Sequence, residues 1–244
     1  MNLIPEHRAL LGVDVVGSAS NPGYHLNAVA ECVDELLCEA LATSSIPRHE
    51  VVDWESTGDG ALLALPSRYL GRLLDCSQHL DALAAVRNRW QKPEICLRIA
   101  IEIGPVGGRP GFYAAKIALS RMLEAKEFKA LFGRCREERP GDVASSALIV
   151  SEKVLGAAFG GDHTDLVRRS DFAALPLRNK EHSDTAWVRV PGFDPRSLDS
   201  FVSPRSEEGA QRPSVQVSNT SYGTNQGVQA HTVNGGVTFG AVPR

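Results

Sequence analysis

Apolar residues along the chain fall into two patterns. In the first, short continuous runs about as long as one buried strand are separated by turn residues such as Gly, Pro, Asn and Ser. These runs are RALLGVDVV (8–16), EVVDWES (50–56), ALLALP (61–66), ICLRIAIEIGPV (95–106) and SALIVS (146–151). Closing strands are expected within 166–180 and 185–190, so the pattern predicts one sheet.

In the second pattern, apolar residues recur every three or four positions, which is the spacing of one helix face. The first such stretch carries Leu26, Val29, Val33, Leu36, Leu37 and Leu41. Helices are therefore predicted over 24–42, 67–90 and 112–132, and Ser151 with Glu152 is suited to begin another. This order predicts an α+β domain with a ferredoxin-like βαββαβ core, added C-terminal strands and helices that cover the sheet.

The composition changes after Pro195. Residues 196–213 are polar and rich in Pro, Ser, Arg and Glu, which is typical of a linker. Residues 214–240 contain no Asp, Glu, Lys or Arg and are rich in Asn, Gln, Ser, Thr, Gly and Val. We therefore divide the chain into a folded domain (1–195), a linker (196–213) and a polar tail (214–244) that cannot form a core of its own.

Composition also narrows the class of protein. The net charge of −3 over 244 residues gives no sign of a surface that coats nucleic acid. No apolar stretch approaches the roughly 18–20 residues that span a membrane, and the N-terminus lacks the pattern of a secretory signal. The cysteines include no C-x-x-C pair for zinc or redox chemistry. We expect a cytoplasmic protein with reduced cysteines and with neither nucleic acid nor membrane as a partner.

Two acidic residues interrupt the apolar strands. Asp14 lies inside the run LLGVDVVG, where an unpaired carboxylate would be costly to bury. Asp59 lies at the tip of the predicted hairpin, in STGDG (56–60). The first strand and the hairpin of a βαββ unit can lie side by side, so the two carboxylates are candidates to hold Mg²⁺ or Mn²⁺. The alternatives are an ordinary turn at Asp59, and a cap or an ion pair with a buried arginine at Asp14.

Six segments resemble motifs of the class III nucleotidyl cyclases. In chain order they are VDVVGSAS, STGDGALLAL, LRIAIEIGPV, ALSRMLEA, SSALIVSEKV and LPLRNKEHSDTAWVRVPG, and they cover roughly residues 8–192. Each segment alone is weakly specific, whereas six in the family order are much more specific. The resemblance implies the class III cyclase fold and conversion of an NTP to a 3′,5′-cyclic nucleotide and pyrophosphate. It also implies two Mg²⁺ or Mn²⁺ ions as cofactors.

The resemblance implies roles for individual residues. Asp14 and Asp59 match the two metal-binding aspartates, and Val15 matches the position whose backbone carbonyl also touches a metal. Arg121 matches the arginine that stabilises charge on the α-phosphate, a task that suits a permanently charged, bidentate guanidinium. Such sites form between two subunits, with the metals from one and the arginine from the other. A homodimer or a larger even assembly is therefore implied.

The remaining roles concern the nucleotide. Lys180 matches the lysine that binds the terminal phosphates, with Arg178 as its near alternative. Glu55 occupies the base-reading position, where a glutamate resembles the guanylate cyclases, and Tyr113 is a candidate for the second base-reading residue. Compact cyclases of this kind also resemble the Pycsar anti-phage pyrimidine cyclases, so Glu55 alone does not settle the base.

Ordinary interpretations stand beside these roles. Arg121 would then be a solvated helix residue, Glu55 an exposed strand residue and Lys180 a polar loop residue. One position departs from the family pattern, because Ile117 stands where the family helix carries the asparagine that orients the ribose. This departure favours an alternative function, a cyclase-like adaptor or nucleotide sensor without turnover. A polymerase-like palm enzyme would share the βαββαβ core, but the missing basic surface argues against it.

The tail carries a separate resemblance. Its stretch NQGVQAHTVNGGVTF resembles the short amyloid-signalling motifs of bacterial defence proteins, which are similar to RHIM-type sequences. Such motifs template like motifs in a partner, so an amyloid-motif partner protein and a setting in bacterial anti-phage signalling are implied. The side chains expected to stack between neighbouring copies of the motif are those of Asn225, Gln226, Val228, Gln229, Val233, Asn234, Val237 and Phe239. The alternative is a disordered polar tail.

Overall fold

A computed structural model gives the structure of the protein and describes residues 5–18, 23–107, 113–138, 144–161, 163–178 and 183–202. The elements that it describes belong to one compact unit, Met1–Pro204. The expectations for Lys180 and for the tail (214–244) lie outside the described residues, as do those for the side chain of Arg178.

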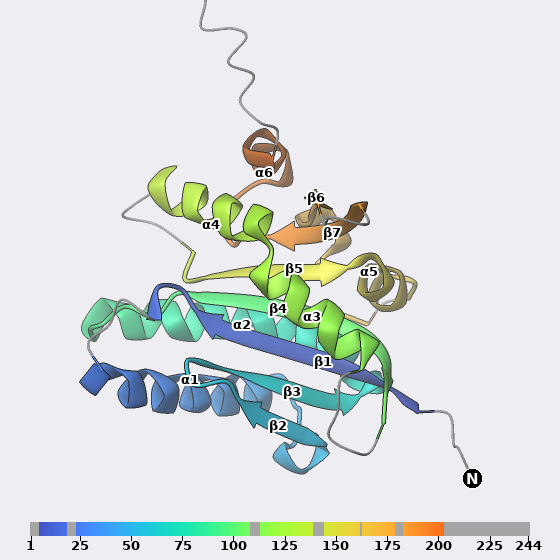
Figure 1. The fold of residues 1–244 in the computed structure, drawn as a ribbon, viewed down its shortest axis with the longest axis horizontal. Helices are drawn as coiled ribbons and strands as arrows, with labels where there is room; N and C mark the ends of the chain where they lie inside the picture. Colours follow the sequence, from blue (N-terminus) through green and yellow to red (C-terminus); the bar gives the residue numbers. More distant parts are fainter. Residues whose placement is uncertain are drawn as a thin grey trace, which may run out of the picture. The chain divides into compact units, whose positions relative to one another are not determined.

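Within the described residues, seven strands form one sheet in the order β2-β3-β1-β4-β5-β7-β6 (Figure 1). The strands are β1 (Glu6–Val15), β2 (Asp53–Ser56), β3 (Gly60–Pro66), β4 (Leu97–Val106), β5 (Ser146–Ser151), β6 (Ala173–Arg178) and β7 (Ser183–Arg189). All neighbours are antiparallel except β4 and β5, which are parallel. The order β2-β3-β1-β4 confirms the predicted ferredoxin-like core, and β5, β7 and β6 are the predicted additions.

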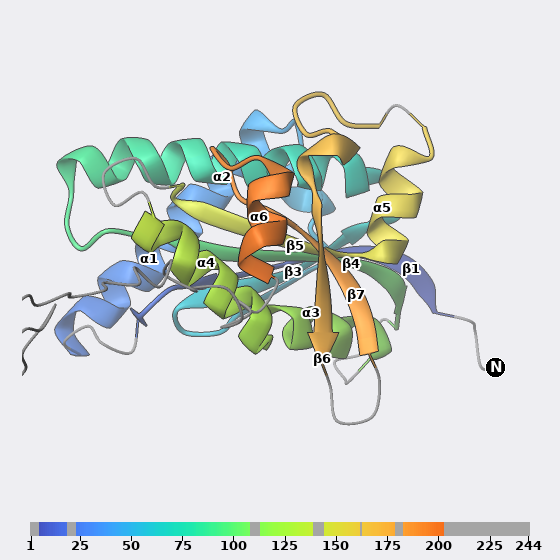
Figure 2. The same ribbon diagram turned by 90° about the horizontal axis from the view of Figure 1, so that it is seen from above.

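Helices cover both faces of the sheet (Figures 1 and 2). They are α1 (Gly23–Thr43), α2 (Leu70–Trp90), α3 (Ala114–Glu124), α4 (Lys126–Glu138), α5 (Glu152–Phe159) and α6 (Pro195–Val202). Short 3₁₀ turns in the described part of the chain include η2 (Arg48–Glu50), η3 (Ser67–Tyr69) and η4 (Arg169–Asp171). Helices α1 and α2 pack on one face, and α3 and α4 pack on the other. None of the described helices is long and apolar enough to cross a membrane.

The alternation of side chains along β1 explains the two cores. Its odd-numbered residues from Ala9 to Val15 join the core beneath α1 and α2, whereas Leu10 joins the core beneath α3 and α4. A Cβ added at Gly12 would meet two leucines of α3. Successive strand residues point to opposite faces, so Asp14 lies on the face that α3 covers.

The helix predicted over 112–132 is two helices in the structure. The chain leaves helical geometry at Ala125, with φ −58° and ψ 125°, so α3 ends at Glu124 and α4 begins at Lys126. The change of direction lets Phe128 and Phe132 of α4 enter the same core as the buried leucines of α3. Helical periodicity alone could not locate this break, because both helices present apolar residues to one core.

The segment expected to be a linker, 196–213, begins with helix α6. Leu198 of this helix is fully buried, and Phe201 packs edge-on against Phe193 with ring centroids 6.1 Å apart. The Asp194 carboxylate accepts a hydrogen bond from the Arg196 backbone N–H at the start of the helix. The polar composition predicted a linker here, although a short helix needs only a few apolar residues to pack against the domain.

Candidate active site

Asp14 lies next to the last residue of β1, in the middle of the sheet. It is opposite Gly60 of β3 on one side and opposite Arg98 of β4 on the other. Arg98 donates two hydrogen bonds to it, from Nε to Oδ1 at 2.8 Å and from Nη2 to Oδ2 at 2.7 Å. The two side chains are only 15% and 14% exposed. Pairing with a buried arginine, one of the alternatives for Asp14, is therefore present in the structure.

The carboxylate of Asp14 also has negative neighbours. Burial raises its pKa above the ordinary value, and Arg98 opposes this effect through its hydrogen bonds and its charge. The charges of Asp59 and Glu124 raise the pKa of Asp14 further. The two aspartates predicted to share a cation therefore lie within electrostatic reach of each other.

The β2–β3 hairpin needs both of its glycines to present Asp59. Gly58 has a φ of +95°, in the left-handed region that favours glycine. At Gly60 a Cβ would lie 2.0 Å from the carbonyl oxygen of Val13, so only glycine lets β3 approach β1 this closely. The hydroxyl of Ser18, just beyond β1, donates a hydrogen bond to the carboxylate of Asp59. The hairpin tip is thus tied to the same end of β1 that carries Asp14.

The donor chemistry at this end of β1 fits a hard divalent cation. Asp14 and Asp59 offer carboxylate oxygens, and Val15, the last residue of β1, brings a backbone carbonyl to the same end of the strand. An oxygen that accepts from Arg98 keeps a second lone pair, so Asp14 can still accept another ligand. Among the described residues, no group of three or more His, Cys, Asp or Glu side chains is arranged to hold a metal ion. Further oxygens would have to come from the main chain, water or a bound phosphate.

A groove of about 380 Å³ lies between the β2–β3 hairpin and α3. It is lined by Glu55, Leu62, Lys116, Ile117, Ser120, Arg121 and Glu124. Two of the predicted site residues, Glu55 and Arg121, therefore share one groove. Ile117, which stands in the position expected to orient the ribose, lines it as well and is 36% exposed.

Lys116 is the cation of this groove that contacts Glu55. Its Nζ donates to Oδ2 of Asp53 at 2.9 Å and also to the carboxylate of Glu55. Burial acts to lower the pKa of Lys116, but the hydrogen bonds to Glu55 and Asp53 outweigh it and the pKa is raised. The hydrogen bond from Lys116 in turn lowers the pKa of Asp53. Glu55 is therefore one half of an ion pair at the edge of the groove.

Arg121 lies in the last turn of α3, and its side chain is exposed. Besides the groove, it lines a second hollow of about 240 Å³, whose walls include Glu102, Ser151, Lys153 and Asp184. The Glu102 carboxylate in that hollow is buried and accepts from the Ser151 hydroxyl at 2.9 Å. No hydrogen bond or ion pair joins Arg121 to another side chain that the structure describes. Its guanidinium is thus available to an anion from outside.

The structure places the predicted residues in two groups. Asp14, Val15 and Asp59 lie at the end of β1, and Glu55 and Arg121 lie in the groove. In the part of the chain that is described, no hydrogen bond or ion pair joins Arg121 to either aspartate. Arg178 is the last residue of β6. Tyr113 immediately precedes α3 and packs against the core beneath that helix.

Two residues of this region were not identified from the sequence. Arg98 is a charged residue within an apolar strand, as Asp14 is, and pairing these two strands in antiparallel register would have placed them opposite each other. Lys116 has no comparable signal, because its partners Asp53 and Glu55 lie on a strand far away in the sequence.

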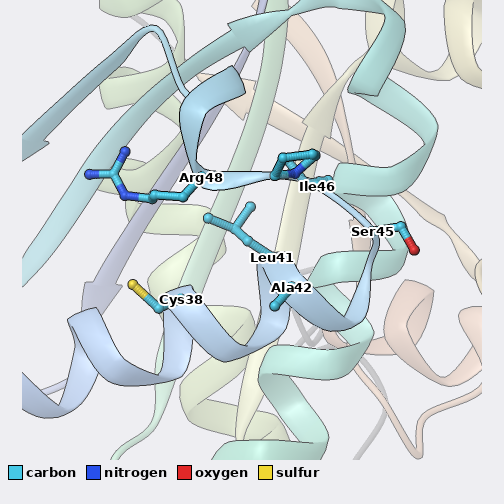
Figure 3. A pocket seen from close by; sticks show the side chains of 7 residues that line it. Cys38, Leu41, Ala42, Ser45, Ile46 and Arg48 are labelled. Atoms are coloured by element: carbon cyan, nitrogen blue, oxygen red, sulfur yellow. The ribbon is translucent and has the colours of Figure 1, made fainter.

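A further hollow, of about 370 Å³, lies at the C-terminal end of α1 (Figure 3). It is lined by Cys38, Leu41, Ala42, Ser45, Ile46, Pro47 and Arg48. None of the predicted site residues contributes to it, so it is separate from the groove beside α3.

Comparison with solved structures identifies the fold. An adenylate/guanylate cyclase/hydrolase from Silicibacter pomeroyi is 19% identical, with 76% of this chain and 97% of that chain covered and a TM-score of 0.50. The guanylate cyclase domain of RhGC from Catenaria anguillulae, solved with GTP, is 14% identical, with 78% and 99% covered and a TM-score of 0.51. A bacterial light-regulated adenylyl cyclase is 9% identical, with 82% and 98% covered and a TM-score of 0.53.

These likenesses confirm the predicted α+β fold of the class III cyclase type. No family model matches the sequence, and no curated protein matches it either. At such low identities the comparison establishes the fold alone. Substrate and activity therefore have to be argued from the residues.

Proposed function

We propose that this chain, which has the fold of adenylate and guanylate cyclase domains, is a cytoplasmic, metal-dependent nucleotidyl cyclase. It would convert an NTP to a 3′,5′-cyclic nucleotide and pyrophosphate. The observation that carries the proposal is the placement of Asp14 and Asp59 at one end of β1: Asp14 is opposite Gly60, the residue after Asp59, and Ser18 donates a hydrogen bond to Asp59. These two carboxylates come from different parts of the chain and lie at the same end of β1, in a sheet of cyclase topology.

In the proposed reaction the ribose 3′-oxygen forms a bond to the α-phosphorus. The bond from that phosphorus to the oxygen of pyrophosphate breaks, and the hydroxyl proton passes to solvent. Asp14, Asp59 and the carbonyl of Val15 would hold two Mg²⁺ or Mn²⁺ ions, which supply Lewis-acid stabilisation of the phosphates when bound. Arg121, which has no side-chain partner among the described residues, would stabilise negative charge on the α-phosphate. Lys180 is proposed to bind the terminal phosphates.

We propose that the complete site forms between two copies of the chain. The acidic pair and Arg121 belong to separate groups of residues, and Arg121 is exposed beside the groove. In a homodimer, the acidic pair of each protomer would lie opposite the Arg121 of its partner, which gives two sites at one interface. Sedimentation with and without NTP and Mn²⁺ tests this arrangement.

Glu55 is proposed to read the base, and Arg178 is the alternative to Lys180 for the terminal phosphates. A carboxylate accepts from the N–H groups of guanine, and the Catenaria anguillulae domain was solved with GTP. GTP is therefore the first substrate to test. Lys116, bonded to Glu55, adds donors beside that acceptor. The pyrimidine nucleotides UTP and CTP, which Pycsar-type cyclases use, are the alternatives.

The deciding experiment is incubation of the purified chain with each of the four NTPs and Mn²⁺, followed by chromatographic separation of the products. A cyclic nucleotide from one NTP, formed about 100-fold or more slowly by the Asp59→Asn variant, is the expected result. If NTP binds and no cyclic product forms from any of the four, the chain is not a cyclase. The outcome would then favour the second candidate, an adaptor or sensor, which is supported by the apolar Ile117 in the groove.

For the tail we propose recruitment through an amyloid-like motif within 214–244, in bacterial anti-phage signalling. The support is compositional: 214–240 carry no charged residue and repeat Val next to Asn, Gln or Gly. The full-length chain should form fibres that bind thioflavin, and a chain ending at residue 213 should form none while keeping its cyclase activity. A full-length chain that never forms fibres would contradict this proposal.

A further inference from the structure

Arg98 is a cation in direct contact with one of the candidate metal ligands, Asp14. Strands β1 and β4 pair so that Arg98 and Asp14 are directly opposite each other. The guanidinium contacts both carboxylate oxygens, at 2.8 and 2.7 Å, and both side chains are mostly buried. A bidentate pair of this kind fixes the plane of the carboxylate as well as its position.

The local charges do not cancel. Asp59 and Glu124 act on Asp14 with the same sign as its own charge, and Arg98 acts with the opposite sign. Among the described residues that act on Asp14, three carboxylates, its own included, and one guanidinium give a net negative charge, which attracts a cation less strongly than the carboxylates would alone. Because the Arg98 guanidinium contacts both carboxylate oxygens of Asp14, it would repel a metal ion held by that carboxylate.

From this arrangement we propose that Arg98 is a positioning residue that holds Asp14 in place and sets a low affinity for free divalent cations. This inference rests on the proposed function, because it takes the acidic pair as the cation site. Its consequence is that the site fills well only when phosphate oxygens add further negative charge. Removing the charge of Arg98 should therefore tighten the binding of free metal, although the residue touches no metal itself.

The size of the effect follows from Coulomb's law. If a divalent ion and a guanidinium lie about 6 Å apart and are screened as in water, their repulsion lowers the affinity for the ion by about tenfold. Weaker screening inside the protein makes the loss of affinity larger. A purely structural role predicts the reverse, because loss of the pair would loosen Asp14 and weaken any site that depends on it.

The test is a titration of the full chain with Mn²⁺ at pH 8 without nucleotide, in which electron paramagnetic resonance measures the Mn²⁺ that stays free. Arg98→Gln should bind Mn²⁺ about tenfold more tightly than the wild type, whereas Arg98→Lys, which keeps the charge, should stay within about threefold. Arg68→Gln is the matched control, because it removes an arginine from another ion pair, with Glu50, and should leave Mn²⁺ affinity unchanged. Equal or weaker Mn²⁺ binding by Arg98→Gln would overturn the inference.

A second measurement uses the wild type, in which the ion pair between Arg98 and Asp14 is intact. In the wild type, the Nε–H resonance of Arg98 should exchange slowly with solvent and should shift when Mg²⁺ is added to saturation. An unchanged resonance would also overturn the inference. Failure of this inference can be told from failure of the proposed function. The Mn²⁺ titration measures affinity for free metal, whereas the assay with four NTPs measures cyclic product.

Discussion

The hydroxyl of Ser18 donates a hydrogen bond to the carboxylate of Asp59, and this bond joins the end of β1 to the tip of the β2–β3 hairpin. Ser18 is itself buried and Asp59 is half-buried, so the contact is partly shielded from water. The position of Asp59 relative to Asp14 therefore depends on a side-chain bond in addition to the pairing of β1 with β3.

The first prediction concerns these two residues. Asp59→Asn should lower cyclic-nucleotide formation by about 100-fold or more, because it removes a charged ligand of the proposed cation site. Ser18→Ala should lower it by only about 3- to 10-fold, since the carboxylate remains but can rotate. Initial rates with Mn²⁺ and GTP measure both effects, and circular dichroism checks the fold. An Asp59→Asn variant with wild-type rates would refute the assignment of Asp59.

The second prediction separates the two glycines of the hairpin. Gly60→Ala should prevent β3 from pairing with β1 at that point, because the added Cβ would lie 2.0 Å from a backbone oxygen. We expect a loss of more than about 3 kcal/mol in the free energy of unfolding, or no folded protein. Gly58→Ala should cost only about 1–2 kcal/mol, since its Cβ meets no atom within 4 Å and only the positive φ is strained. Urea unfolding compares the two, and equal losses would contradict the prediction.

The third prediction concerns the buried carboxylate of Asp75 on α2. It accepts backbone N–H groups from Asp165, Leu166 and Val167 at 2.8, 2.9 and 3.1 Å. In Asp75→Asn the amide would turn a donor toward this set of donors, at a cost of about 3 kcal/mol. For a chain of this size the melting temperature should fall by about 6–12 °C. Asp199→Asn, on the exposed face of α6, is the control and should change it by less than about 2 °C.

The fourth prediction concerns the cysteines, all of which are free. Burial raises the pKa of Cys76 and of Cys135 to about 12, so neither thiol ionises in the folded protein near neutral pH. Cys38 is exposed. Titration with a chromogenic disulfide at pH 8 should therefore show one fast-reacting thiol, which Cys38→Ser removes. Rapid reaction of Cys76 or Cys135 before unfolding would contradict this.

The fifth prediction is a pH dependence. Because the hydrogen bond from Lys116 lowers the pKa of Asp53 in the folded state, the pair contributes stability above the unfolded pKa of an aspartate. That contribution is lost as the pH falls through the lowered, folded pKa. Lys116→Met should therefore melt about 2 °C below the wild type at pH 7, a small effect because the carboxylates are partly exposed. The gap should close as the pH is lowered toward 3, and a gap that widens in acid would contradict the ion pair.

The sequence was sufficient to predict the order of strands and helices, because buried strands and amphipathic helices differ in the period of their apolar residues. It also indicated Asp14, since a charge in an otherwise apolar strand requires a partner. It could not reveal that this partner is Arg98, because that follows from the register of two strands distant in sequence. The break at Ala125 and the helix α6 were missed for the same reason: both are decided by packing against distant residues.

The register of β1 has an evolutionary consequence. Since side chains alternate along a strand, sliding β1 by one residue against β3 and β4 would send Asp14 into the opposite core along with every apolar neighbour. The position of residue 14 is thus inherited together with the hydrophobic interior, and selection for stability preserves that position even where activity is not under selection. Glu55, which is proposed to read the base, is exposed on β2 and has no such constraint, so a lineage could exchange one nucleotide for another there while the fold and the register of β1 stayed constant.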